Sequence, residues 1–478
     1  MRSPRILVAT VGAGLVTFDP DADNCFELND IAADVVRRLE KPTTFEDLRV
    51  QVLANYDVTP EQCARDLREL LEELQSEGLV ESHFGPIDPA QPAAPKALEV
   101  EAHCTHRTRI HPIEAELPYG RLSCEFQLCI ECCKFAFVSH DLKMVRELAQ
   151  RADWSRFLVL ARHHRIQGIA WNCLSDLEEM VPNETGQALF AEATEIAADN
   201  LRASADCRAL LKTFDAAKIP LVFLKGLTLG SLAYSNPSLK AAIDIDLLID
   251  PADLGKAARL LRDCGYRLVA PANHEVLNAW HRGWKESVWT KDSPPLQIDL
   301  HTRTADNRHL IPDINVHSPR HWVDIGDSIR LPTLADDELF AYLAVHGASS
   351  AWFRLKWISD FAALVQGRGA VEIEHLYRRS QELGAGRAAG QALLLADELF
   401  GVLEQSPALR GELARDRATQ RLYRAALRLL TDEPREPTER RWGTMTIHWT
   451  QFLLLPGLSY KISELSRQAG RLHSRRDA

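Results

Sequence analysis

The chain has 478 residues, an apolar fraction of 46% and a formal net charge of −11. This length predicts about three domains, and the apolar fraction is sufficient for hydrophobic cores. Because nucleic acids and anionic membranes favour basic surfaces, the negative charge disfavours DNA and membranes as partners. No apolar run is long enough to span a membrane and no signal-peptide core follows MRSPR, so we expect a cytoplasmic protein with reduced thiols.

The first 85 residues indicate three short strands followed by three helices. Strands are expected at 5–10, 14–18 and 25–28, and Asn29, Thr44 and Thr59 stand where helix N-caps are expected. Proline follows Thr59 at the first helical position, where proline is favoured. Acidic residues outnumber basic ones about two to one in this segment, which disfavours DNA binding. The pattern predicts a winged-helix-like domain.

This segment resembles the PqqD family of peptide-chaperone modules, also called RiPP recognition elements, over roughly residues 5–85. The resemblance rests on the stretches CFELND, IAADVVRRLE, TTFEDLRVQVLANYDVTPEQ and LRELLEELQSEGLVE. It implies that a leader peptide adds as a strand beside Cys25–Leu28, facing the helix that carries Arg65 and Arg68. The alternative is that these residues only pack and solvate the module.

A segment rich in proline and alanine separates this module from the rest of the chain. A group of four cysteines follows this segment. Together with Cys104, His106 and His111, these cysteines could form a zinc or iron–sulfur site. The spacing fits no established pattern, so ordinary thiols are favoured at Cys124, Cys129, Cys132 and Cys133. The expected domains are 1–85 for peptide binding, 86–144 as linker, 145–215 as a helical region, 216–330 as the catalytic core and 331–478 as a C-terminal helical region.

Two carboxylates alternate inside an apolar strand in the stretch LVFLKGLTLGSLAYSNPSLKAAIDIDLLID. Asp244 and Asp246 are two residues apart, so in a strand they project from the same face. Such a pair is costly unless something neutralises it, and Mg²⁺ bound by carboxylates and substrate phosphates is the usual solution. A second alternating strand, PLQIDLHTR, places Asp299 and His301 on one face, and Asp299 is the natural third carboxylate.

The turn upstream of the two carboxylates has the properties of a phosphate site. Lys225 and Gly226 lead from a strand into a helix N-terminus, where free backbone N–H groups and the helix dipole favour anions. Thr228 could donate its hydroxyl, and Lys240 could reach the same phosphates. Further along, Pro251 is expected to begin a helix that continues through LGKAARLLRDCGYRLV.

These motifs together resemble the nucleotidyltransferase superfamily with the DNA polymerase β-like fold, and more narrowly its uncharacterised nucleotidyltransferase family. The stretches DWSRFLVLARHHRI, HGASSAWFRLKWISDFAALV and FLLLPGLSYKISELSRQAGRL agree, so the resemblance covers roughly 145–470. It implies an α+β protein with a mixed-sheet core flanked by helices. It also implies that Asp244, Asp246 and Asp299 hold two Mg²⁺ ions while a nucleotidyl group moves from an NTP to an acceptor.

The chain departs from the superfamily pattern at three places. Lys225-Gly226 stands where Gly-Ser is usual, Lys240 where arginine is usual, and Ile243 where a small residue is usual. The fusion of the two resemblances favours a leader-guided enzyme that modifies a ribosomal peptide. The alternatives are a non-catalytic peptide-binding scaffold, or a nucleotidyltransferase that acts on RNA, an antibiotic or a protein.

Other side chains near these motifs have two interpretations each. Lys356 either contacts the triphosphate or pairs with Asp360 four residues later on a helix. The indoles of Trp280, Trp284 and Trp289 either stack a base or, as we favour, pack in the core.

Overall fold

The computed structural model describes residues 1–82, 122–138, 141–241, 244–292, 295–431, 434–439 and 443–474. Most of the expected linker, together with Cys104, His106 and His111, lies outside the described residues, and so does Ile243. The chain divides into two compact units, which are Met1–Ser3 with Asp34–Leu122, and Pro4–Ala33 with Ser123–Ala478. The expected domain boundaries differ from this division and stay predictions.

Helices make up most of the described part of the first unit. It holds the end of α1 (Asp30–Arg38) and the whole of α2 (Phe45–Leu53) and α3 (Pro60–Ser76). The side chains of Thr44 and Thr59 accept hydrogen bonds from backbone N–H groups in the first turns of α2 and α3, as the sequence predicts. The apolar positions at helical spacing are buried, among them Leu48, Leu67 and Leu74.

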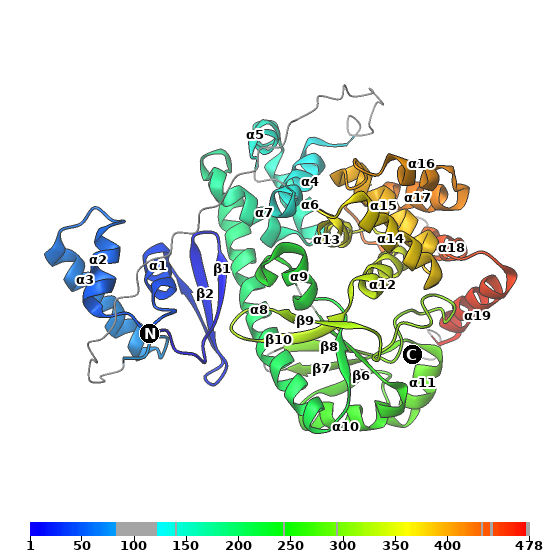
Figure 1. Cartoon of the computed structure of the whole chain (residues 1–478), viewed down its shortest axis with the longest axis horizontal. Coiled ribbons are helices and arrows are strands. Elements are labelled where there is room, and N and C mark those ends of the chain that lie inside the picture. Colours follow the sequence, from blue (N-terminus) through cyan, green and yellow to red (C-terminus); the bar gives the residue numbers. More distant parts are fainter. Residues whose placement is uncertain are drawn as a thin grey trace. The chain divides into compact units, whose positions relative to one another are not determined.

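The second unit begins with a small antiparallel sheet. Its strands are β1 (Leu7–Val11), β2 (Gly14–Asp19) and β3 (Asn24–Leu28), in that order. Strands β1 and β2 pack against the long helix α8 (Asn183–Ala216), as Figure 1 shows. The outer edge of β1 is partly covered, because the Val8 N–H donates to Asp327 Oδ2 at 2.7 Å. Strand β3 pairs only with β2 within the described part of the chain.

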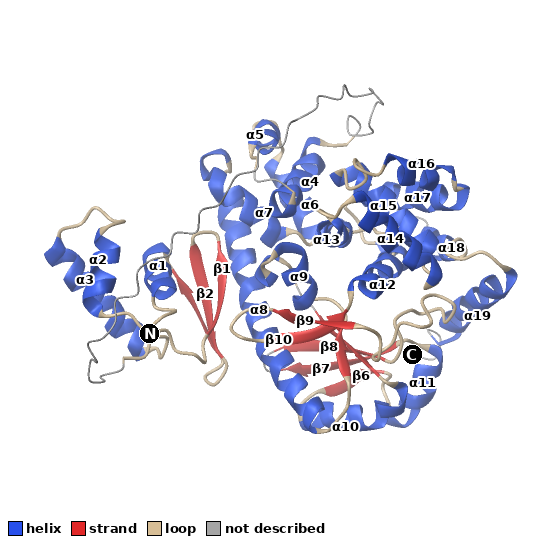
Figure 2. Ribbon diagram, in the orientation of Figure 1, coloured by secondary structure: helices blue, strands red, loops and turns tan. Residues whose placement is uncertain are grey.

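A mixed five-stranded sheet forms the centre of this unit (Figure 2). Its strands follow the order β4-β5-β8-β7-β6, and only the β5–β8 pair is parallel. The strands are β4 (Leu221–Phe223), β5 (Asp244–Ile249), β6 (Arg267–Ala270), β7 (Glu286–Asp292) and β8 (Pro295–His301). A separate hairpin is formed by β9 (Arg320–Asp324) and β10 (Arg330–Leu334).

Three helices connect the strands of the central sheet, namely α9 (Leu227–Tyr234), α10 (Leu254–Asp263) and α11 (Leu277–Gly283). The expectation that one helix runs from Pro251 through Val269 is wrong at its end. Helix α10 stops at Asp263, Gly265 adopts a φ of +86°, and the chain continues as strand β6. A positive φ suits glycine and ends the helix, and the alternating side chains that follow pair with β7.

Helices precede and follow the central sheet, which confirms the predicted α+β class with a mixed sheet flanked by helices. The preceding helices are α4 (Cys124–Phe137), α5 (Lys143–Ala149), α6 (Trp154–His164), α7 (Gln167–Leu174) and α8. The following helices are α12 (Asp336–Ser349), α13 (Leu355–Val365), α14 (Ala370–Glu382), α15 (Gly386–Phe400), α16 (Pro407–Arg415), α17 (Arg417–Thr431), α18 (Met445–Gln451) and α19 (Leu458–Ser474). None of the described helices has the length and apolar character needed to cross a bilayer.

Candidate active site

The parallel pairing of β5 with β8 brings the predicted carboxylates together. Asp246 lies directly opposite Asp299 in the register of the two strands, and Asp244 begins β5. Neighbouring strands are about 5 Å apart, so side chains at matched positions on one face are adjacent. All three carboxylates line a cavity of about 360 Å³. The structure therefore assembles the three predicted residues at one place.

The two matched carboxylates have opposite electrostatic environments. Burial alone would raise the pKa of Asp246, but Lys225 Nζ at 2.6 Å and His301 Nε2 at 3.0 Å outweigh burial and hold this pKa well below its usual range. Burial also raises the pKa of Asp299, and the charges of Asp246, Glu286 and Asp244 raise it further, to about 7. The pair thus combines one firmly ionised carboxylate with one that exchanges its proton near neutral pH.

Two residues that the sequence did not suggest complete this network. Glu286 Oε2 lies 3.3 Å from His301 Nε2 and 2.5 Å from Lys285 Nζ. Burial would raise the pKa of Glu286, but the Lys285 ammonium and His301 lower it to about 2. Glu286 stands opposite His301 in the register of β7 with β8. The sequence signal for Glu286 is its position at the start of the alternating strand ESVWT. This position indicates a contact with His301 only once the pairing of β7 with β8 is known.

The turn between β4 and α9 contains a backbone conformation that favours glycine. Gly226 has φ +72° and ψ −123°, and it caps α9. Lys225 precedes it, and its Nζ also lies 3.5 Å from Asp244 Oδ2. Lys225 and Gly226 line the cavity, whereas Thr228 is buried and its hydroxyl donates to the Lys225 carbonyl at 3.3 Å. The Thr228 hydroxyl thus contacts the backbone of the turn, and Thr228 does not line the cavity.

Lys240 lines the same cavity but its ammonium is paired inside the protein. It is 4% exposed, and its Nζ lies 2.8 Å from Asp360 Oδ2. The Tyr234 hydroxyl donates to Asp360 Oδ1 at 3.0 Å. Lys356 donates instead to the Ala241 carbonyl, and burial together with the Lys240 charge lowers the pKa of Lys356 to about 7. The ion pair of Asp360 is thus with Lys240, and Lys356 contributes a weakly basic amine to the cavity wall.

Aromatic side chains line the cavity, but they are not the ones that the sequence singled out. Trp280 and Trp284 stack on each other with ring centroids 5.0 Å apart, and Trp289 is fully buried. None of these three lines the cavity, whereas Trp352 and Trp357 do. Trp352 lies between α12 and α13, and Trp357 lies in the first turn of α13, so only the tertiary structure relates them to the carboxylates.

The carboxylate cluster has a donor set that fits a metal ion. One ligand atom each from Asp246, Asp299 and His301 lies within 4.8 Å of the others. Mg²⁺ prefers oxygen ligands, which the two aspartates supply. His301 Nε2 already contacts Asp246 Oδ1, an arrangement that orients the carboxylate. The cluster could therefore hold a divalent cation.

The cysteines of α4 are buried thiols. Cys129, Cys132 and Cys133 are fully buried, and Cys124 is half-buried. Burial raises the pKa of Cys133 to about 12 and raises that of Cys129 well above its usual value. These thiols thus stay protonated at neutral pH.

Comparison with known families matches two separate parts of the chain. A family described as "Uncharacterised nucleotidyltransferase" matches residues 150–401, more than half of the chain. A family described as "Coenzyme PQQ synthesis protein D (PqqD)" matches residues 14–80. No curated protein sequence matches the chain. The first match contains every residue of the carboxylate cluster, and the second contains β2, β3 and the first three helices.

Proposed function

Since the chain belongs to the family of uncharacterised nucleotidyltransferases, we propose that it moves a nucleotidyl group from an NTP to an acceptor in an Mg²⁺-dependent reaction. The observation that carries this proposal is the register match of Asp246 with Asp299, with Asp244 beside them in one cavity. These three carboxylates would hold Mg²⁺, which would activate the attacking oxygen and stabilise the leaving pyrophosphate.

The remaining residues of the cavity have roles that follow from their contacts. Lys225 neutralises Asp244 and Asp246 and stands at the start of α9, where an ammonium and free backbone N–H groups bind phosphate. His301 keeps Asp246 oriented. In the metal-free protein, burial and the neighbouring carboxylates raise the pKa of Asp299 to about 7, so Mg²⁺ would displace a proton when it binds there, and Gln297 donates to Asp299 Oδ1 at 2.9 Å.

The PqqD match supports a peptide as the acceptor or as its carrier. Strand β3 lacks a second neighbour within the described residues, so its edge offers backbone groups to an added strand. Addition of a leader peptide beside Asn24–Leu28 would use backbone hydrogen bonds for affinity. A captured leader would raise the concentration of the acceptor at the catalytic cavity, which supports modification of a ribosomal peptide.

Calorimetry with ATP, GTP, CTP and UTP, with and without Mg²⁺, tests the catalytic part. We expect Mg²⁺-dependent binding of at least one NTP by the full-length protein, lost in the double variant Asp244→Asn/Asp246→Asn. The exposed Asp215 at the end of α8 supplies a matched control, and Asp215→Asn should bind as the wild type does. NTP binding that survives in the double variant, or no binding at all, would contradict the assignment and favour a scaffold.

Hydrogen exchange tests the peptide part. Peptides selected from a displayed random library on the full-length protein would be synthesised and added back. We expect slower exchange of the backbone amides of Asn24–Leu28 in the presence of such a peptide, because the new strand would protect them. A bound peptide that leaves these amides unprotected would exclude strand addition at β3.

A further inference from the structure

A second cavity adjoins the catalytic one. It has a volume of about 430 Å³, and Thr304 and Ala305 line both cavities. Three arginines line it, Arg282, Arg303 and Arg308, and its lining contains no aspartate or glutamate. We call it the arginine cavity. An acid-free wall with three guanidinium groups stands out in a chain whose formal net charge is −11.

Within the described residues, the arginines of this cavity are not in direct contact with carboxylates, although the charge of the nearby Asp306 acts on Arg303. None of the three arginines forms an ion pair with a carboxylate in the described part of the chain. Arg303 donates to the carbonyls of Ala305, His281 and Gly283, which uses three of its five N–H groups and supplies no negative charge. Burial and the nearby charge of Arg308 lower the pKa of Arg303.

His281 adds no charge to this wall. Its ring nitrogens lie 2.8 Å from Thr302 Oγ1 and 3.0 Å from Ser287 Oγ. Burial and the charges of Arg303 and His301 lower the pKa of His281 to about 4, so the ring is neutral at pH 7. The arginines therefore supply the whole positive charge of the cavity wall.

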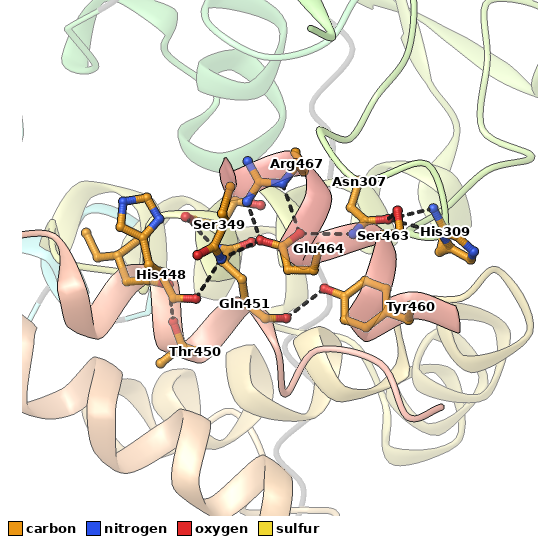
Figure 3. Close-up of polar contacts among 12 residues, drawn as sticks. Asn307, His309, Ser349, His448, Thr450, Gln451, Tyr460, Ser463, Glu464 and Arg467 are labelled. Atoms are coloured by element: carbon orange, nitrogen blue, oxygen red, sulfur yellow. Dashed lines mark hydrogen bonds and ion pairs between the residues drawn. The ribbon is translucent and has the colours of Figure 1, made fainter. Parts of the chain in front are cut away.

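The loop that carries two of the arginines is held in place by the C-terminal helix. Asn307 Nδ2 donates to Glu464 Oε2 of α19 at 2.9 Å (Figure 3). Glu464 is fully buried, and Arg467 and Gln468 donate to its carboxylate at 2.9 and 2.7 Å. Asn307 lies between Arg303 and Arg308, so this buried contact fixes the segment from which both arginines project. The site is thus a built feature of the fold.

The rest of the lining is apolar, with Leu254, Leu310, Ile311 and Ile314 among its members. Guanidinium groups form paired hydrogen bonds with phosphate and carboxylate, and the apolar wall suits a hydrocarbon or ring. We propose that the arginine cavity binds the acceptor, and that the acceptor carries a phosphate or carboxylate attached to an apolar body. This proposal rests on the proposed nucleotidyl transfer, because it places the acceptor beside the catalytic carboxylates.

Chain continuity supports that placement. Strand β8 carries Asp299, and the residues that follow it, from Thr302 to Thr304, form the wall of the arginine cavity. Asp306, two residues after Thr304, lines the catalytic cavity and not the arginine cavity. An acceptor anchored by the arginines would direct its other end toward Asp299.

Ligand-observed NMR on the full-length protein tests the proposal, with phenyl phosphate and benzoate as probes. Mg²⁺ and a non-hydrolysable ATP analogue would fill the catalytic cavity. We expect saturable binding of at least one probe, weakened about tenfold or more in Arg282→Gln/Arg308→Gln, because two charged hydrogen-bond donors are lost. The exposed Arg421 of α17 lines neither cavity, so Arg421→Gln should bind as the wild type does.

The outcomes separate this proposal from the proposed function. Unchanged probe affinity in the double variant, or no saturable binding of either probe, would overturn the arginine cavity whatever the NTP result. Arginine-dependent probe binding without NTP binding would support the cavity and refute the nucleotidyl-transfer site. Arginine-dependent binding of an RNA oligonucleotide, without binding of the small probes, would overturn the small-acceptor assignment.

Discussion

Asp299→Asn should stabilise the metal-free protein above pH 7, although Asp299 belongs to the proposed active site. The carboxylate is buried opposite Asp246 and near Glu286, and together these raise its pKa to about 7. The folded protein therefore binds a proton that the unfolded chain releases near pH 4. Asparagine removes the buried charge and keeps the oxygen that accepts from Gln297.

The sign and size of the expected change in the free energy of unfolding follow from the linkage between proton binding and folding. Between about pH 4 and 7 the folded state binds more protons than the unfolded state, so the contribution of Asp299 to stability falls as the pH rises and is constant above that window. A rise in pKa from 3.8 to about 7 corresponds to on the order of 4 kcal/mol, which is a ceiling because water in the cavity screens the charges. We expect Asp299→Asn to gain about 1–3 kcal/mol at pH 8.5 and less at pH 5.

Urea unfolding in EDTA, followed by tryptophan fluorescence at pH 5 and 8.5, measures this effect. Asp246→Asn provides the contrast, because it leaves the buried Lys225 without its nearest carboxylate and should cost about 3–5 kcal/mol. If Asp299→Asn destabilised the protein at pH 8.5, or if its effect did not change with pH, the electrostatic account of the two carboxylates would be refuted.

Four further outcomes are expected. Lys225→Met should weaken NTP binding at least tenfold in calorimetry, because it removes the cation beside the phosphate site; unchanged affinity would contradict this. Asp360→Asn leaves the Lys240 ammonium buried without its carboxylate and should cost about 3–5 kcal/mol in urea unfolding, and a loss below about 1 kcal/mol would argue against the pair. Gly226→Ala places a side chain at φ +72° and should cost about 1–3 kcal/mol, whereas wild-type stability would show that the turn adjusts. Mg²⁺ affinity should increase as the pH rises through about 7, since Asp299 must lose its proton to bind the cation, and a flat calorimetric profile would oppose its role as a ligand.

The sequence was sufficient for the carboxylates because their signal is local. An apolar strand shows its period of two in the residues themselves, so Asp244 and Asp246 could be placed on one face without knowledge of the sheet. Asp299 required only the further assumption that its strand lies next to theirs, and the register with β5 bears this out. Several of the short strands and helices followed from similar local patterns, whereas the α+β class with a mixed sheet was implied by the family resemblance.

The contacts that the sequence did not show depend on tertiary partners. Lys240 is expected to reach the phosphates because it precedes the carboxylates by a few residues, and the structure adds that its ammonium pairs with Asp360 on α13. Glu286 is close to His301 only through the pairing of β7 with β8. The arginine cavity joins α11 to the loop after β8, and no short motif contains both. Pairings between distant segments leave no periodic signal in a single sequence.

The packing of β1 and β2 against α8 has a consequence for any exchange of the segment that matches the PqqD family. The PqqD match begins with the first residue of β2, Gly14, yet Pro4–Ala33 belong to the same compact unit as the catalytic sheet. An exchange of the PqqD segment for that of a different protein would also replace β2, which packs against α8 in the unit that contains the catalytic sheet. A functional chimera must therefore either keep the native faces of β1 and β2 that pack on α8 or carry a matching α8 with the donor segment. The limits of the PqqD match thus differ from the limits of the compact structural units in this chain.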